Sequence, residues 1–411
     1  MNKVATLATL SPDIPRRDRV AARLVFAQLS GWKGGALTLT LPDGRVLEFG
    51  EPTSAHRVTL TVKEWRFFWR ALTAGDVGVA EAYMEGEWTC SDLVELCRLF
   101  MRDQSMLEYR SVWTIAARLQ HAWLRLSRAN TLSGSRRNIQ SHYDLSNALY
   151  RLFLDDSMMY SCAVFAHDRA SLEEAQRHKI DGICQQLQLS PGLDVLEIGS
   201  GWGAFAIHAA QHYGCRVTSL TLSQQQWQLA RERVAAAGLE SQVDIRLCDY
   251  RTITGRYDRI VSIEMFEAVG YEYYPAFFRQ CSDLLKPNGR MFLQTIYIPD
   301  QRFDAYRRDF DWIRKYIFPG SLLASVHGIA AALKHHTALR IEWMQDIGVH
   351  YARTLRTWRE RFLSRLHEVH QLGFDDRFIR MWEFYLASCE AGFATRYIGD
   401  VQMILVRPSV E

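Results

Sequence analysis

The spacing of hydrophobic and polar positions differs between the first part of the chain and the rest. Residues 31–50, GWKGGALTLTLPDGRVLEFG, alternate Leu and Thr and contain Asp43-Gly44, which predicts two strands joined by a turn. Residues 62–102 then follow a mostly helical spacing that several glycines interrupt. The N-terminal part of the chain is therefore predicted to be a small α+β unit.

The next segment combines aromatic and basic side chains on one predicted helix. Residues 108–128, EYRSVWTIAARLQHAWLRLSR, have the spacing of an amphipathic helix that contains Trp113, Trp123 and several Arg. Such a helix either packs its apolar face on a protein core or lies at a membrane surface, where Trp beside Arg suits the headgroup region. The polar stretch at 130–138, NTLSGSRRN, is interpreted as a linker.

From about residue 190 onward, strand-like apolar runs alternate with helical ones. The predicted strands are LDVLEIG (193–199), RVTSLTL (216–222), VDIRLCD (243–249), YDRIVSIEM (257–265) and RMFLQTIYI (290–298). One intervening helix, SQQQWQLARERVAAAG, has Ser223 as its N-cap and Gly238 as its stop. This alternation predicts an α/β fold, a parallel sheet covered on both faces that binds its ligand at the carboxyl ends of the strands.

Two features mark that edge of the predicted sheet. Gly199, Gly201 and Gly203 in VLEIGSGWGAF follow a strand and precede an Ala-rich helix, which is typical of a nucleotide-binding turn. Their GxGxG spacing differs from the GxGxxG dinucleotide fingerprint, and no acidic residue ends the second strand. In the last strand, Gln294 and Thr295 interrupt an apolar run. Because burying such groups without a partner is costly, we expect them to face a ligand.

Composition narrows the class of protein. The 411 residues are 48% hydrophobic and 23% charged, as in a folded chain with a full-sized core. A net charge of +3 does not indicate a nucleic-acid partner, although it is compatible with an anionic surface. The eight Cys contain no CxxC pair, so no zinc site or disulfide framework is indicated. The chain has neither a membrane-spanning apolar run nor an apolar signal region at its start. We therefore expect a cytoplasmic protein with peripheral membrane contact.

Two sequence motifs resemble those of class I S-adenosylmethionine-dependent methyltransferases. The E-x-G-x-G-x-G sequence that begins at Glu197 is similar to the first motif of that superfamily, in which the glycines admit the methionine moiety. The stretch LLKPNGRMFL (284–293) is similar to the Lys-Pro-x-Gly turn before its fifth strand. The resemblance implies a Rossmann-like sheet with helical insertions that form a lid.

Five further motifs, in the same order, resemble the cyclopropane fatty acid synthase family, which includes the mycolic acid cyclopropane synthases. They are SRRNIQSHYDLSNALYRLFLDDSMMYSCAVF (135–165), LTLSQQQ (220–226), SIEMFEAVGYEYYPAFF (262–278), DFDWIRKYIFPGSLLAS (309–325) and HYARTLRTWRERF (350–362). The resemblance covers roughly residues 60–402. It implies a lipid- or membrane-binding domain at 1–130, a linker and the start of the lid at 131–145, and a catalytic domain at 146–411. It also implies a homodimer at the inner membrane.

The family transfers a methylene group from S-adenosylmethionine to the cis double bond of an acyl chain in membrane phospholipids, through a carbocation that bicarbonate deprotonates. Such a site needs an apolar groove, groups that stabilise the cation and a base. The resemblance implies that Cys162, Glu267, Gln294, Ile296 and Tyr351 surround the bicarbonate. The cofactor-binding residues that it implies are Tyr160, Ser161, Glu197, Gly199, Gly201, Thr221, Leu222, Gln226 and Tyr250. The segment HYD at 142–144 is expected near the lid.

Three positions depart from the family pattern. Gln294 stands where the family has His, and a neutral amide donates to an anion but does not relay a proton. Ala268 stands where many relatives have His, and Glu264 where many have a small residue. Glu264 is either a solvated loop acid or a functional carboxylate. Cys162 is not expected to be a nucleophile, since nothing around it in the sequence indicates an activated thiolate.

The change at Gln294 leaves two enzymatic hypotheses. The first is cyclopropane formation, and the second is a methyltransferase that leaves a methyl-branched or methylene-substituted chain on the same lipids. A lipid-binding protein without catalytic activity is a hypothesis of a different class, against which the intact glycines, Glu267 and Tyr351 argue. A small-molecule amine methyltransferase would leave residues 1–130 and the acyl-family motifs without a use.

Overall fold

The computed structural model describes residues 10–102 and 146–409 of the chain. Their contacts form two compact units. The described residues before 103 form one unit together with 363–397, and the remaining described residues form the other. The predicted helix at 108–128, the linker at 131–145 and the HYD segment all lie outside the described residues.

The first unit is a small α+β structure. Its elements are α2 (Arg16–Leu29), β1 (Ala36–Thr40), β2 (Val46–Gly50), β3 (Arg57–Val62), α3 (Arg66–Met84), β4 (Trp88–Cys90), α4 (Leu93–Arg102), α17 (Leu366–Gln371) and α18 (Asp376–Ala394). The predicted hairpin is confirmed: β1 pairs antiparallel with β2, and Gly44 in the turn has a φ of 84°, which an L-residue rarely adopts. The strand β3, which lies parallel to β1, was not predicted.

Residues 363–397 group with this unit and not with the rest of the predicted domain at 146–411. Within the unit, Tyr83 Oη on α3 donates to Glu383 Oε2 on α18 at 2.8 Å. Arg377 Nε on α18 lies 2.9 Å from Glu85 Oε1 just after α3. The first unit is therefore discontinuous in sequence, because a helix near the end of the chain packs on helices near its start.

The second unit is built on a seven-stranded sheet. Its strands are β5 (Asp194–Ile198), β6 (Arg216–Thr221), β7 (Val243–Leu247), β8 (Tyr257–Ile263), β9 (Leu285–Tyr297), β10 (Arg340–Asp346) and β11 (Gly399–Val406), in the order β10-β11-β9-β8-β5-β6-β7. The five predicted strands are all present and parallel. The strands β10 and β11 were not predicted, and β11 is antiparallel to both of its neighbours.

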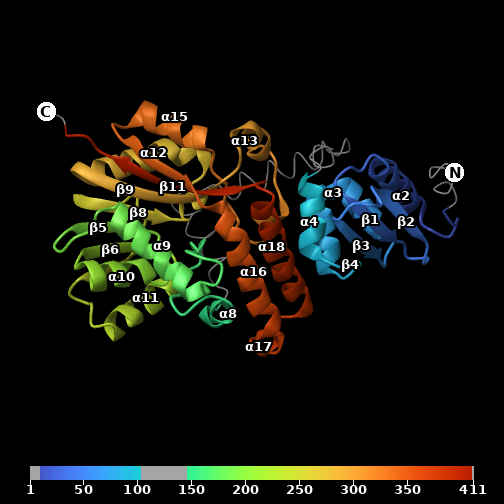
Figure 1. Ribbon diagram of the computed structural model, residues 1–411, viewed down its shortest axis with the longest axis horizontal. Helices are drawn as coiled ribbons and strands as arrows, with labels where there is room; N and C mark the ends of the chain where they lie inside the picture. The colour runs from blue at the N-terminus through green and yellow to red at the C-terminus, as the bar shows by residue number, and fades with distance from the viewer. Residues whose placement is uncertain (1–9, 103–145, 410–411) are drawn as a thin grey trace. The chain divides into compact units, whose positions relative to one another are not determined.

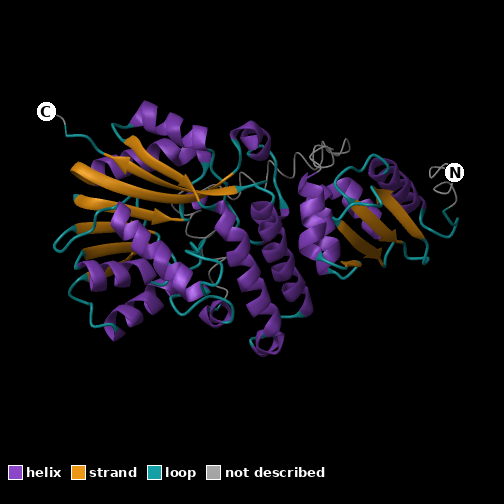
Figure 2. Ribbon diagram, in the orientation of Figure 1, coloured by secondary structure: helices purple, strands orange, loops and turns teal. Residues whose placement is uncertain are grey.

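Helices cover both faces of this sheet, as predicted (Figures 1 and 2). The helices are α8 (Asn147–Arg151), α9 (Leu172–Gln186), α10 (Ala204–Tyr213), α11 (Gln224–Ala236), α12 (Tyr274–Leu284), α13 (Asp300–Tyr306), α14 (Trp312–Tyr316), α15 (Val326–His336) and α16 (Gly348–Ser364), with short 3-10 turns η1 (Phe266–Ala268) and η2 (Tyr271–Tyr273). Because successive strand residues face opposite sides, Leu196 packs with α12 and α15, and Val195 packs with α9, α10 and α11. Ser223 caps α11 as predicted, and Gly238 follows its end with a φ of 69°.

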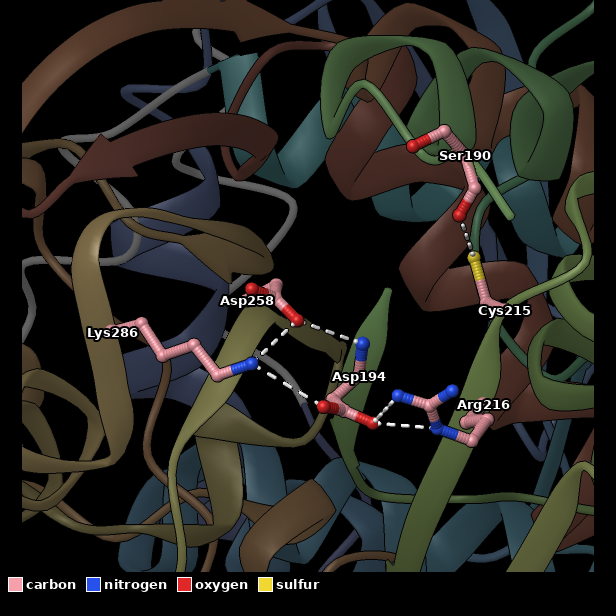
Figure 3. A network of polar contacts seen from close by, with 6 residues as sticks. All are labelled: Ser190, Asp194, Cys215, Arg216, Asp258 and Lys286. Atoms are coloured by element: carbon pink, nitrogen blue, oxygen red, sulfur yellow. Dashed lines mark hydrogen bonds and ion pairs between the residues drawn. The ribbon is translucent and has the colours of Figure 1, made fainter. Parts of the chain in front are cut away.

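The amino-terminal ends of the strands are joined by an ion-pair network (Figure 3). Lys286 Nζ on β9 lies 2.8 Å from Asp258 Oδ2 on β8 and 3.3 Å from Asp194 Oδ2 on β5. Arg216 on β6 pairs with Asp194 Oδ1 at 2.8 Å. The Lys-Pro-x-Gly turn thus ties neighbouring strands together at the edge opposite to the predicted site.

Within the described residues, no helix combines the length and the apolar character that crossing a membrane requires. The same residues hold no group of His, Cys, Asp and Glu arranged to bind a metal ion.

Candidate active site

The predicted nucleotide-binding turn lies at the carboxyl end of β5. Gly199, Gly201 and Gly203 all have positive φ, at 100°, 49° and 84°. A Cβ on Gly199 would lie 2.9 Å from the Cβ of Met265, whereas one on Gly201 would meet open space. Gly203 precedes α10 without a side-chain cap, so the amide groups at the start of α10 remain available to a ligand. The turn therefore fits a nucleoside-type cofactor.

The end of β6 adds a polar group beside this turn. Thr221 Oγ1 donates to Gln226 Oε1 at 2.9 Å and accepts from the backbone N–H of Ser223 at 3.1 Å. Leu222 lies between them and is half-buried. The backbone N–H of Ser200, within the glycine turn, donates to the carbonyl of Leu220 at 2.8 Å. These contacts hold the end of β6 against the glycine turn.

Glu197 lies inside the sheet. It is 3% exposed, and its carboxylate accepts a hydrogen bond from Ser219, its register partner on β6. Burial raises its pKa to about 8, and the hydrogen bond from Ser219 opposes that rise. The structure thus places Glu197, an expected cofactor residue, just before the glycine turn, where one of its carboxylate oxygens already accepts a hydrogen bond from Ser219.

Aromatic side chains surround the same edge. The rings of Tyr160 and Tyr150 are 5.3 Å apart, and Tyr150 lies 4.9 Å from Trp202 in the glycine turn. Tyr250 follows β7, is half-buried and packs edge-on against Phe277 at 5.2 Å. The structure therefore brings Tyr160 and the glycine turn into one aromatic cluster.

A second group of polar side chains lies at the carboxyl ends of β8 and β9 and centres on Glu264. The backbone N–H of Cys162 donates to Glu264 Oε1 at 2.8 Å, and Gln294 Nε2 donates to the same oxygen at 2.7 Å. The hydroxyl of Tyr351 donates to Glu264 Oε2 at 2.5 Å. Three of the five residues expected around bicarbonate thus converge on a carboxylate of the chain itself.

The amide of Gln294 is almost fully engaged. Its Nε2 also donates to Asp400 Oδ2 at 2.9 Å, and its Oε1 accepts from Gln402 Nε2 at 3.1 Å. Gln294 and Asp400 are both 0% exposed. The polar interruption of β9 is therefore satisfied by side chains of β11 and by Glu264, where the sequence predicted a ligand.

Glu267 forms a separate arrangement nearby. Its Oε1 accepts from the backbone N–H of Ile296 at 2.5 Å and from Thr295 Oγ1 at 3.0 Å. Among the described residues, its buried Oε2 has no hydrogen-bond partner. Burial, reinforced by the nearby Glu264 carboxylate, raises the pKa of Glu267 to about 8. This carboxyl group is available to hold or release a proton near neutral pH.

A buried lysine lies beside the cluster. Lys179 Nζ donates to Ser161 Oγ at 2.5 Å, and Ser161 is the residue before Cys162. Burial lowers the pKa of Lys179, although Glu264 among other acidic groups opposes this change. Burial and the neighbouring Glu264 and Glu267 carboxylates raise the pKa of Asp400 well above its usual range. We therefore assign the proton of the Glu264–Asp400 pair to Asp400.

The expectation for Cys162 agrees with its surroundings. The thiol is fully buried and contacts the carbonyl oxygens of Ala163 at 3.3 Å and Ile347 at 3.8 Å. Burial raises its pKa well above the usual value, so the thiolate form that attacks an electrophile is disfavoured. Cys162 contributes its backbone N–H to the site.

Sequence reasoning missed Asp400, Gln402 and Lys179. Asp400 and Gln402 lie on the unpredicted strand β11, opposite Ile296 and Gln294 of β9. Lys179 lies within α9, and nothing in its local sequence separates it from a surface lysine. The signal that was available was a pair of polar residues, Asp400 and Gln402, on one face of an apolar run.

Comparisons with known proteins agree with this architecture. A family model described as mycolic acid cyclopropane synthetase matches residues 131–403. The chain is 44% identical over 343 residues to the tuberculostearic acid methyltransferase UfaA1 of Mycobacterium tuberculosis. This aligned region covers 81% of the chain and 79% of the relative. The chain is 37% identical over 356 residues to the cyclopropane-fatty-acyl-phospholipid synthase of Escherichia coli K12, with coverage of 85% and 87%. The solved structure of the mycolic acid cyclopropane synthase CmaA1 with SAH and CTAB matches with a TM-score of 0.61 and 32% identity, covering 66% of this chain and 98% of that chain.

Proposed function

The chain belongs to the mycolic acid cyclopropane synthetase family, and on that premise we propose that it transfers one carbon from S-adenosylmethionine to the double bond of an unsaturated acyl chain in membrane phospholipids. It is an enzyme of the S-adenosylmethionine-dependent lipid methyltransferase and cyclopropane synthase family. The cofactor is supported by the SAH bound in the solved relative of the same fold. The glycine turn after β5 and the polar end of β6 are the residues that would hold it.

The product that we propose carries a methylene group and no ring. The observation that carries this choice is the side chain of Glu264, which accepts hydrogen bonds from Cys162, Gln294 and Tyr351 where the family resemblance implies bicarbonate. We infer that a carboxylate fixed to the chain in that place, instead of a diffusible base, lets the cation rearrange before the proton is lost. The 44% identity to a relative named as a methyltransferase supports the same choice.

Ring formation is the second candidate. It is favoured by the family model, which is described by cyclopropane synthesis, and by the 37% identity to the synthase of Escherichia coli. Both products add one CH2 to the acyl chain and are isomers. They differ in that hydrogenation adds two hydrogen atoms to a methylene group and leaves a cyclopropane ring intact.

Membrane contact is proposed through the first unit. On α2, Val20 is 47% exposed and Leu24 is 41% exposed, and the exposed Arg16 and Arg17 lie at the start of the same helix. Apolar side chains beside arginines suit a surface of anionic phospholipid. We propose peripheral association with the cytoplasmic face of the inner membrane, and a homodimer as the assembly that acts there.

The test is the mass of the acyl chains after reaction. Purified protein is incubated with S-adenosylmethionine and vesicles of an unsaturated phospholipid, and the released fatty acids are measured before and after hydrogenation. The proposal expects a gain of one CH2 followed by uptake of two hydrogen atoms. A CH2 gain that resists hydrogenation would favour the ring, and no gain at all would refute acyl-chain transfer.

A further inference from the structure

Glu264 lies where the family resemblance implies that bicarbonate, a base from solution, binds. Bicarbonate would need N–H and O–H donors that converge on an anion. In this chain three such donors, from Cys162, Gln294 and Tyr351, already point at one carboxylate group at distances of 2.5–2.8 Å. The place of the small anion is therefore filled by a side chain of the chain itself.

The backbone at Glu264 gives independent support. Its φ is 47°, in the left-handed region that favours Gly, and a residue with a side chain is less stable there by about 1–2 kcal/mol. Its backbone N–H donates to the carbonyl of Gln294 at 2.8 Å, which holds this conformation. A Glu in this conformation with its carboxylate held by three donors is costly as a structural element. Functional sites are where such strain is found.

The other carboxyl groups of the cluster are less suited to this task. Asp400 is fully buried behind Gln294 and holds the shared proton. Glu267 binds the N–H of Ile296 and is 9% exposed. Glu264 is instead the carboxylate on which the donors of Cys162, Gln294 and Tyr351 converge.

We propose that Glu264 is the general base of the reaction and that this enzyme therefore needs no bicarbonate. The inference rests on the proposed one-carbon transfer to an acyl chain and names the group that receives the proton. Gln294 and Tyr351 act as positioning residues, because they fix both oxygens of the carboxylate.

The chemical step balances without a further reactant. The π electrons of the double bond form the new C–C bond as the C–S bond of the methyl donor breaks, and its electron pair remains on sulfur. A hydride then moves from the methylated carbon to the adjacent cationic carbon. Glu264 takes one proton from the added methyl group, and the electrons of that C–H bond form the C=CH2 double bond on the open chain. The proton passes to water before the next turnover.

Burial and the groups around Glu264 have opposing effects on the pKa of its carboxyl group. Burial raises the pKa of Glu264 above its usual value, while Lys179 and the hydrogen bonds from Tyr351 and Cys162 oppose the rise.

The test uses Glu264→Gly with Glu264→Gln as its matched control. Glycine suits the backbone angle and opens a hole lined by the three donors, whereas glutamine fills the hole with a neutral group. Removing a general base is expected to lower turnover by about 10²–10⁴-fold in both variants. Added bicarbonate is expected to restore activity in Glu264→Gly and to have no effect on Glu264→Gln. Wild-type turnover is expected to be unchanged in buffer freed of carbon dioxide.

A second readout separates this inference from the proposed function. Binding of ¹³C-bicarbonate is measured from the width of its NMR line. Binding is expected with Glu264→Gly and not with the wild type, whatever lipid is the substrate. Wild-type turnover that falls in carbon-dioxide-free buffer and returns with bicarbonate would overturn the inference, as would bicarbonate binding to the wild type. Failure of the wild type to convert S-adenosylmethionine with any unsaturated lipid would refute the proposed function alone.

Discussion

Replacing Glu267 by Gln should make the protein more stable and less active, with a gain in stability that grows with pH. The carboxyl group is buried, its Oε1 accepts from Ile296 and Thr295, and its Oε2 has no partner among the described residues. Glutamine keeps an acceptor for the first two contacts and removes the ionisable group. The variant therefore separates the electrostatic cost of Glu267 from its packing.

The magnitude follows from the two pKa values. The pKa of Glu267 is 4.5 in an unfolded chain and about 8 in the folded protein, owing to burial first and to Glu264 second. Because the folded value is the higher one, the folded state binds the extra proton, and parent stability falls as the pH rises from 4.5 to 8. At 1.36 kcal/mol per pKa unit, the variant should gain about 3–4 kcal/mol on the parent between pH 5 and pH 8.

The assay is thermal unfolding of both proteins at pH 5 and pH 8, together with turnover. A difference of that size corresponds to a widening of the Tm gap by about 4–7 °C for a unit or chain of this length. The amide left without an acceptor lowers the stability of the variant by a constant amount, so it does not affect the change with pH. Turnover should fall while S-adenosylmethionine still binds, because the family resemblance places Glu267 among the residues that surround the base. A Tm gap that does not change with pH, or a variant of near-parental activity, would refute this reasoning.

Three further changes probe other parts of the molecule. Lys179→Met removes the buried donor to Ser161 Oγ and should lower the free energy of unfolding by about 1–3 kcal/mol, measured by chemical denaturation; unchanged stability would show that the cluster does not depend on this donor. Lys286→Met breaks ion pairs of a side chain that is 36% exposed, so it should cost less than about 1 kcal/mol and leave turnover unchanged, which a kinetic assay checks. The double variant Val20→Ser/Leu24→Ser should reduce co-sedimentation with anionic vesicles without changing turnover of detergent-dispersed lipid; equal sedimentation would exclude this face of α2.

The fold was predictable for strands whose burial gives the sequence a clear hydrophobic pattern. The five predicted strands show apolar runs, or in the edge strand β7 a strict alternation of apolar and charged residues, with a helix or turn beside each. Periodicity therefore identified them all. In contrast, β10 is almost entirely exposed, with burial at Trp343 only in part, and its sequence RIEWMQD lacks an alternation. The placement of α18 was missed because its partners on α3 are about 300 positions away along the chain.

The sequence predicted which residues belong to the site but not the hydrogen bonds between them. The sequence singled out Gln294 and Glu264 as departures from the family pattern. It did not reveal that the two are hydrogen-bonded, because that contact depends on the left-handed turn at Glu264 and on the end of β9 beside it. The burial of Gln294 is explained by Asp400 and Gln402 on a strand that was not predicted. Long-range pairing of this kind is absent from local patterns.

The most direct test of the account uses S-adenosylmethionine with a deuterated methyl group, CD3, in buffer freed of carbon dioxide. The wild-type enzyme is incubated with vesicles of an unsaturated phospholipid, and the masses of the acyl chains are measured by mass spectrometry. Transfer of the methyl group followed by loss of one of its hydrogens to Glu264 predicts a gain of CD2. Chains that remain unlabelled, or that gain CD2 only after bicarbonate is added, would contradict the account.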